Sequence, residues 1–126
     1  MIEQTCRPRL VLAYAEAAHA SRTGRSFRRR GWEVHLVGTS AEARRLTAAL
    51  APELVILDTE LAEESGWLTC AKLRVEQPDQ RIFLVTPHVD ADNQELSDFV
   101  GAAALFARTD DIAVLLPEAA EARVPA

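Results

Sequence analysis

The residue best placed for chemistry in this sequence is Asp58, which ends the continuous apolar run Leu54 to Leu57. Such a run is typical of a central parallel strand buried on both faces. In open parallel sheets, ligands and chemistry lie just beyond the carboxyl ends of the strands. Because an aspartate at a strand end also commonly serves as a turn or capping residue, the chemistry of Asp58 depends on its neighbours.

The candidate neighbours are the residues that follow the other predicted strands. They are Tyr14, Ala15 and Glu16; Gly38 and Thr39; Thr59 and Glu60; Thr86, Pro87 and His88; and Ala107, Arg108 and Thr109. They contain no evident nucleophile–base pair, so a conventional enzyme is not expected. The two distant cysteines, Cys6 and Cys70, indicate neither a zinc site nor a disulfide framework. A small-ligand or nucleotide domain of similar build stays open, although no glycine-rich phosphate loop is present.

The elements that must position these residues alternate along the chain. Strands are predicted near 9–14, 32–37, 54–57, 81–86 and 103–107 from their apolar runs and alternation. Helices are predicted at 15–30, from Thr39 to about Leu50, at 66–76, from Asp90 or Asp92 to Gly101, and from Asp110 with a break at Pro117. Five such units predict a doubly wound α/β fold with a parallel sheet covered by helices on both faces.

Composition and charge indicate a globular protein that stays in the cytoplasm. The 126 residues suit one domain, with 48% apolar residues, 26% charged residues and a net charge of −5. The amino terminus lacks a secretory signal, and the longest apolar run, Phe99 to Ala107, is far shorter than the roughly 20 residues of a membrane helix. The acidic balance makes nucleic-acid binding an unfavoured function.

Several motifs resemble those of response-regulator receiver domains in two-component signal transduction. The stretch Pro52 to Leu61, followed by Ser65-Gly66-Trp67 and Leu73-Arg74, matches the third strand and helix of that family without gaps. Ala62 replaces the usual proline, and Ser65 replaces the usual aspartate. Further matches are Gly31-Trp32-Glu33-Val34, Ser40-Ala41-Glu42-Ala43, Val85-Thr86 and Val100-Gly101-Ala102. The resemblance implies a single receiver-like domain over 1–126, with loose ends at 1–8 and 118–126. It also implies a flavodoxin-like strand order 2-1-3-4-5.

The resemblance implies a site with specific departures from the family pattern. Asp58 matches the phosphoacceptor, Thr86 the switch hydroxyl, and Arg108 the lysine that contacts the phosphoryl group. The acidic pair that holds Mg²⁺ in the family falls on Tyr14 and Ala15, neither of which is a carboxylate. Because Mg²⁺ prefers several oxygen ligands, no metal or other cofactor is expected. Glu16, one position later, is the alternative ligand, and the strand-5 aromatic position falls on Leu105, beside Phe106.

Arg108 therefore has two possible roles. Its guanidinium could grip a phosphoryl group bidentately, or it could pair directly with Asp58 and hold the domain in one state. The favoured hypothesis is an atypical, pseudo-receiver-like protein-interaction module with little or no Mg²⁺-dependent phosphorylation. Its expected partner is a histidine kinase, a phosphotransfer domain of a phosphorelay, or a downstream effector. The alternative is a working switch that accepts a phosphoryl group on Asp58 with unusual ligands.

The first predicted helix carries a basic stripe to which the hypotheses above assign no role. Arg22, Arg25 and Arg29 recur at helical spacing, with Arg28 and Arg30 beside them. The stripe is either a docking face for an acidic partner or for the phosphate backbone of a nucleic acid, or a solvated helix face. Trp32 and Trp67 are interpreted as packing residues, and His88 as a loop residue near the site.

Overall fold

The computed structural model describes residues 7–116. Its strands are β1 (Arg9–Ala13), β2 (Glu33–Val37), β3 (Leu54–Asp58), β4 (Ile82–Thr86) and β5 (Ala104–Ala107). They form one parallel five-stranded sheet in the order β2-β1-β3-β4-β5. The predicted fold class and strand order are confirmed.

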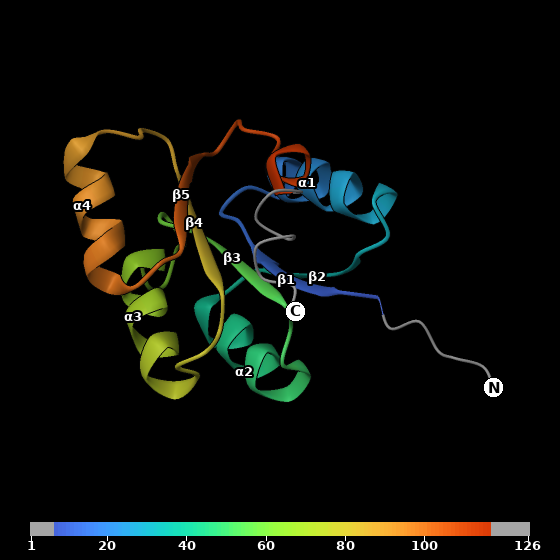
Figure 1. Ribbon diagram of the computed structural model, residues 1–126, viewed down its shortest axis with the longest axis horizontal. Coiled ribbons are helices and arrows are strands. Elements are labelled where there is room, and N and C mark those ends of the chain that lie inside the picture. The colour runs from blue at the N-terminus through green and yellow to red at the C-terminus, as the bar shows by residue number, and fades with distance from the viewer. Residues whose placement is uncertain (1–6, 117–126) are drawn as a thin grey trace, which may run out of the picture.

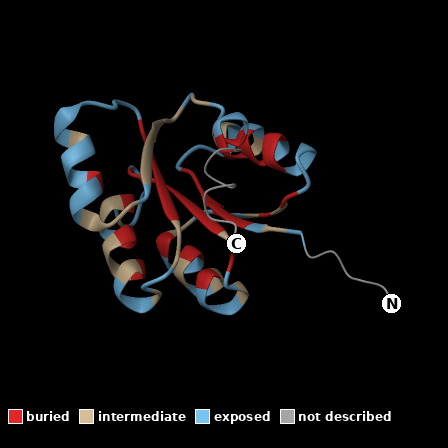
Figure 2. Ribbon diagram, in the orientation of Figure 1, coloured by how far each residue is buried: buried red, intermediate tan, exposed pale blue. Residues whose placement is uncertain are grey.

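The helices are α1 (Ala17–Arg29), α2 (Ser40–Leu50), α3 (Gly66–Glu76) and α4 (Ala91–Val100). A further helical turn spans 112–116. Helix α1 and this turn cover one face of the sheet, and α2, α3 and α4 cover the other (Figure 1). Each face thus has its own core, and the three inner strands β1, β3 and β4 are the most buried part of the sheet (Figure 2).

The helix starts follow the predicted capping residues. The side chains of Thr39, Ser65 and Asp90 accept hydrogen bonds from the backbone N–H groups of Glu42, Leu68 and Asn93. Asp90, not Asp92, therefore opens α4. Each cap satisfies a backbone donor that the helix leaves unpaired, which favours the start of the helix at that residue.

Two details of the sequence-based elements need correction. The first strand ends at Ala13 and α1 begins only at Ala17, so residues 14–16 form the connection that carries Tyr14 and Ala15. The alternation in β2 predicts one apolar face for 32, 34 and 36, but the Leu36 side chain is 41% exposed. The reason is that β2 is an edge strand, paired only with β1. The predicted break at Pro117 and most of the predicted loose ends lie outside the described residues.

Strand β3 positions the candidate site because it is the central strand. Every residue from Leu54 to Asp58 is buried, since β1 and β4 flank it in the sheet and helices cover both faces. Burying a leucine, isoleucine or valine side chain, as in this strand, stabilises a fold by roughly 1.5–3 kcal/mol. The strand therefore holds Asp58 rigidly at its carboxyl end.

Candidate functional site

The carboxylate of Asp58 is fully buried and accepts three hydrogen bonds. Its Oδ2 accepts from the backbone N–H of Ala15 at 2.9 Å, just beyond the neighbouring strand β1. Its Oδ1 accepts from the backbone N–H of Glu60 at 3.0 Å and from Nη2 of Arg108 at 2.8 Å. Both oxygens are thus engaged by donors of this chain, as a buried carboxylate requires.

Arg108 is the cation that balances Asp58. Its backbone N–H donates to the carbonyl of Thr86 at 3.0 Å, which ties the end of β5 to the end of β4. Its side chain is only 14% exposed, and Nη2 also lies 3.3 Å from Oε1 of Glu60. The hydrogen bond to Asp58 raises the pKa of Arg108, against the opposing effect of desolvation. The guanidinium therefore stays charged and closes over the aspartate.

Tyr14 and Ala15, the predicted positions of the acidic pair, directly follow β1. The Tyr14 side chain is only 3% exposed and packs in the core on the α1 face of the sheet. Its hydroxyl accepts a 3.5 Å hydrogen bond from Oγ1 of Thr23. The carboxylate of Glu16, the alternative ligand, lies 3.1 Å from the ring nitrogen Nδ1 of His19 and is largely exposed. It makes no contact with Asp58.

The donor set around Asp58 does not fit Mg²⁺. Magnesium needs several oxygen ligands in near-octahedral geometry. Among residues 7–116, Asp58 is the only buried carboxylate, and its oxygens face N–H donors and a guanidinium. Between residues 7 and 116, no group of three or more His, Cys, Asp or Glu side chains could hold a metal ion.

The other residues singled out from the sequence divide between the carboxyl edge of the sheet and the two cores. Thr86 is buried at the end of β4, in register with Ala107 of β5. Leu105 packs with the core on the α2–α4 face, and Phe106 packs on the opposite face, with its ring centroid 5.2 Å from that of Phe83. His88 is exposed, as expected for a loop residue. Trp32 and Trp67 both pack against core residues.

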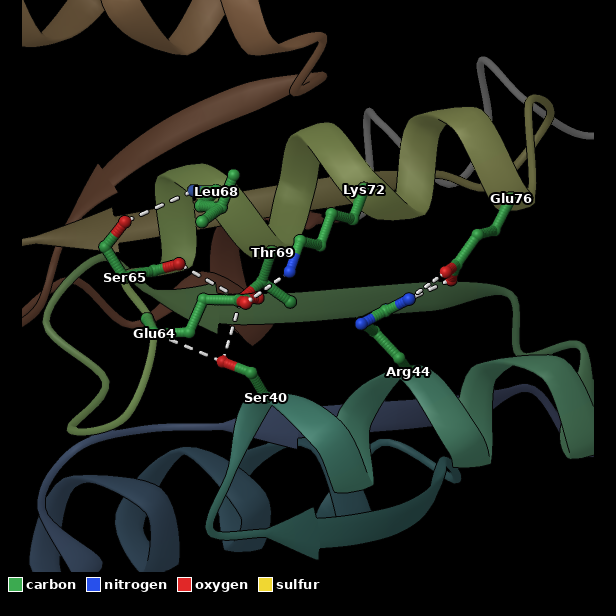
Figure 3. A network of polar contacts seen from close by, with 8 residues as sticks. All are labelled: Ser40, Arg44, Glu64, Ser65, Leu68, Thr69, Lys72 and Glu76. Atoms are coloured by element: carbon green, nitrogen blue, oxygen red, sulfur yellow. Dashed lines mark hydrogen bonds and ion pairs between the residues drawn. The ribbon is translucent and has the colours of Figure 1, made fainter.

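A polar network that the sequence did not predict holds the loop after Asp58. The buried hydroxyl of Thr69 donates to Oε2 of Glu64, and Lys72 lies 2.6 Å from Oε1 of the same carboxylate (Figure 3). The hydroxyl of Ser40, at the start of α2, donates to the backbone carbonyl of Glu64 at 3.1 Å. The hydrogen bond from Lys72 is the main reason that the pKa of Glu64 is lowered. Loop 59–65, which carries Glu60, is thereby tied to both α2 and α3.

Tyr14 gives the site a spectroscopic test because it is the only tyrosine in the chain. Burial raises its pKa from 10.0 to about 12. We expect tyrosinate absorbance to rise near pH 10 in the urea-unfolded protein and near pH 12 in the folded one. Between these values only the unfolded state has lost the proton, so the free energy of unfolding falls as pH rises. Tyrosinate formation near pH 10 in the folded protein would contradict the buried position.

Comparison with known proteins places this chain in a family. The family model described as response regulator receiver domain matches residues 15–107. A search of curated proteins found no match.

Solved structures agree on the fold. A receiver domain protein (CheY-like) from Methanospirillum hungatei is 20% identical, with a TM-score of 0.82 over 93% of this chain and 94% of the other. The BeF3-activated receiver domain of RstA from Klebsiella pneumoniae is 25% identical, with a TM-score of 0.80 over 90% and 96%. A LuxR-family response regulator from Aurantimonas is 24% identical, with a TM-score of 0.80 over 93% and 84%. This chain belongs to the response regulator receiver domain family of two-component signal transduction.

Proposed function

We propose that this chain is an atypical receiver domain that acts as a protein-interaction module, with little or no Mg²⁺-dependent phosphorylation of Asp58. The observation that carries the proposal is the ion pair between Asp58 and Arg108. The guanidinium occupies one oxygen of the carboxylate, and the N–H of Ala15 occupies the other. Phosphoryl transfer depends on positioning and on neutralising the phosphoryl oxygens. Here the positive charge already balances the acceptor itself.

The ion pair also supplies a reason for a single resting conformation. Asp58 comes from β3, Glu60 from the following loop and Arg108 from the end of β5, so their contacts join three segments of the site. A phosphoryl group on Asp58 would have to displace Arg108 from a buried carboxylate, which is costly. In this proposal Asp58 is a structural anion, and a partner reads the fixed surface around it.

The proposed docking surface comprises α4, β5 and the helical turn 112–116. Apolar side chains stand exposed on both sides of β5: Phe99 is 86% exposed on α4, and Val114 and Leu115 are 48% and 52% exposed on the turn. Exposed apolar side chains of this size are common at protein interfaces. A histidine kinase, a phosphotransfer domain or a downstream effector is the proposed class of partner.

Cytoplasmic localisation is part of the proposed function. No helix within residues 7–116 is long and apolar enough to cross a membrane.

Intact-mass measurement after incubation with a small phosphodonor tests the proposal. We expect no phosphoryl adduct, with or without Mg²⁺, because the acceptor is paired and no second carboxylate supports a metal. A conventional receiver domain treated in parallel serves as the positive control for the donor.

An adduct that appears on this chain and disappears in the Asp58→Ala variant would contradict the proposal. It would favour the second candidate, a phospho-switch. The observation in favour of that candidate is the presence of Asp58, Thr86 and Arg108 at one edge of the sheet, where the last could grip a phosphoryl group.

A further inference from the structure

A small cavity beside the candidate site lies between α1 and the segment that follows β5. Its volume is about 90 Å³, enough for a few water molecules or one phosphate-sized anion. Its lining consists of Arg22, Thr23, Ser26, Arg29, Arg108, Thr109, Asp110 and Asp111. The cavity thus combines three guanidinium groups with three hydroxyl groups.

The arginine side chains that line this cavity have hydrogen-bond donors to spare. Arg22 and Arg29 lie two turns apart on α1 and are exposed. Neither forms an ion pair within the described part of the chain. Arg108 uses Nη2 for Asp58, but its Nε is buried and has no partner among residues 7–116. Because a buried unpaired donor is costly, an acceptor at Arg108 would relieve that cost.

The two acidic residues in the lining are already engaged. Oδ2 of Asp110 accepts from the backbone N–H of Ala107 at 3.0 Å, and Oδ1 of Asp111 accepts from the hydroxyl of Ser26 at 2.9 Å. Helix α1 itself contains no acidic residue between Ala17 and Arg29, while Arg25 and Arg28 add further positive charge. Two arginines of the basic stripe, Arg22 and Arg29, therefore line this cavity.

We infer that the cavity is a binding site for a phosphate-sized oxyanion, either inorganic phosphate or the phosphoryl group of a small phosphomonoester. Guanidinium groups bind such oxygens through charge-assisted hydrogen bonds, and the hydroxyl of Thr109, which also lines the cavity, supplies a further donor. Since Arg108 lines the cavity and also holds Asp58, an anion bound there acts on the same guanidinium. The site takes a ligand without any covalent change at Asp58.

Titration of the ¹⁵N-labelled protein with inorganic phosphate tests the inference. The ionic strength is held constant with chloride, and neither phosphodonor nor Mg²⁺ is present. We expect saturable amide shifts at Thr23, Ser26 and Thr109, with weaker shifts at Ala15 and Glu60, whose N–H groups contact Asp58. Phosphoserine in a second titration distinguishes a monoester ligand from free phosphate by its tighter or weaker saturation at the same amides.

Matched arginine variants identify the cavity as the site. Arg22→Ser and Arg29→Ser remove exposed lining residues and should each weaken phosphate binding roughly tenfold. Arg25→Ser lies on the same helix outside the lining and should leave the affinity nearly unchanged. Equal weakening by all three, or shifts with phosphate no larger than with chloride, would overturn the inference. The mass measurement on Asp58 is a separate readout, so failure of one proposal is distinguishable from failure of the other.

Discussion

Replacing Gly66 with alanine is expected to destabilise the domain by roughly 1–3 kcal/mol and to displace Asp58. A Cβ atom built on Gly66 would overlap the carbonyl oxygen of Asp58 and would lie 2.8 Å from its carbonyl carbon and 3.0 Å from Cα of Thr59. These atoms belong to the backbone at the end of the central strand, so no side-chain rotation can relieve the overlap. Forcing such a shift in a well-packed region typically costs 1–3 kcal/mol, occasionally more.

The measurement is urea unfolding of the Gly66→Ala variant, followed by the amide spectrum of Ala15 and Glu60. Gly38→Ala is the matched control, because a Cβ there has no neighbour within 4 Å and the backbone of Gly38 does not have the positive φ that favours glycine. We expect that control to unfold within about 1 kcal/mol of the parent protein. If the two variants unfold at the same urea concentration, the close packing of α3 against β3 is wrong.

The fold was predictable because its signals are local and mutually consistent. Apolar runs mark the strands, and Thr39, Ser65 and Asp90 each begin a helix by accepting a backbone hydrogen bond. The position of Asp58 followed from the same reasoning, because the most apolar run becomes the central strand and its last residue reaches the ligand edge of the sheet.

The contacts of the site were less predictable because they join residues far apart in the chain. The sequence left two roles open for Arg108, and only the fold brings its guanidinium to Asp58, 50 positions away. The N–H of Ala15 carries no sequence signal at all, since every residue except proline has one. The network of Ser40, Glu64 and Thr69 was missed for a similar reason: serine and threonine in a helix indicate no partner until the neighbouring helix is placed.

The exposure of Leu36 shows a further limit of pattern reasoning. Alternation along a strand predicts which side chains share a face, but it does not predict whether a helix covers that face. Strand β2 lies at the edge of the sheet, where coverage is incomplete, so one of its apolar residues remains 41% exposed. Sequence alternation therefore predicted strand β2 correctly but did not predict how far its side chains are buried.

Breaking the Asp58–Arg108 pair from the arginine side is expected to cost about 3 kcal/mol of unfolding free energy. The Arg108→Met variant keeps much of the side-chain volume but leaves a fully buried carboxylate without its cation. Two backbone donors, from Ala15 and Glu60, remain. They compensate only in part because they carry no net charge. Urea unfolding at neutral pH measures the loss, and Arg25→Met, an exposed arginine on α1, should change stability by less than about 0.5 kcal/mol.

A double-mutant cycle, which adds the Asp58→Asn variant and the double variant, tests whether the loss arises from the pair itself. Asp58→Asn removes the buried negative charge while keeping an oxygen that can accept from the backbone, so we expect this variant to lose less than Arg108→Met. In the double variant neither charge is left unpaired, so its loss of unfolding free energy should be smaller than the sum of the two single losses by at least about 1 kcal/mol. Strictly additive losses would mean that Asp58 and Arg108 do not stabilise each other. They would also remove the reason for treating Asp58 as a structural anion, because an aspartate that gains nothing from Arg108 is free to react.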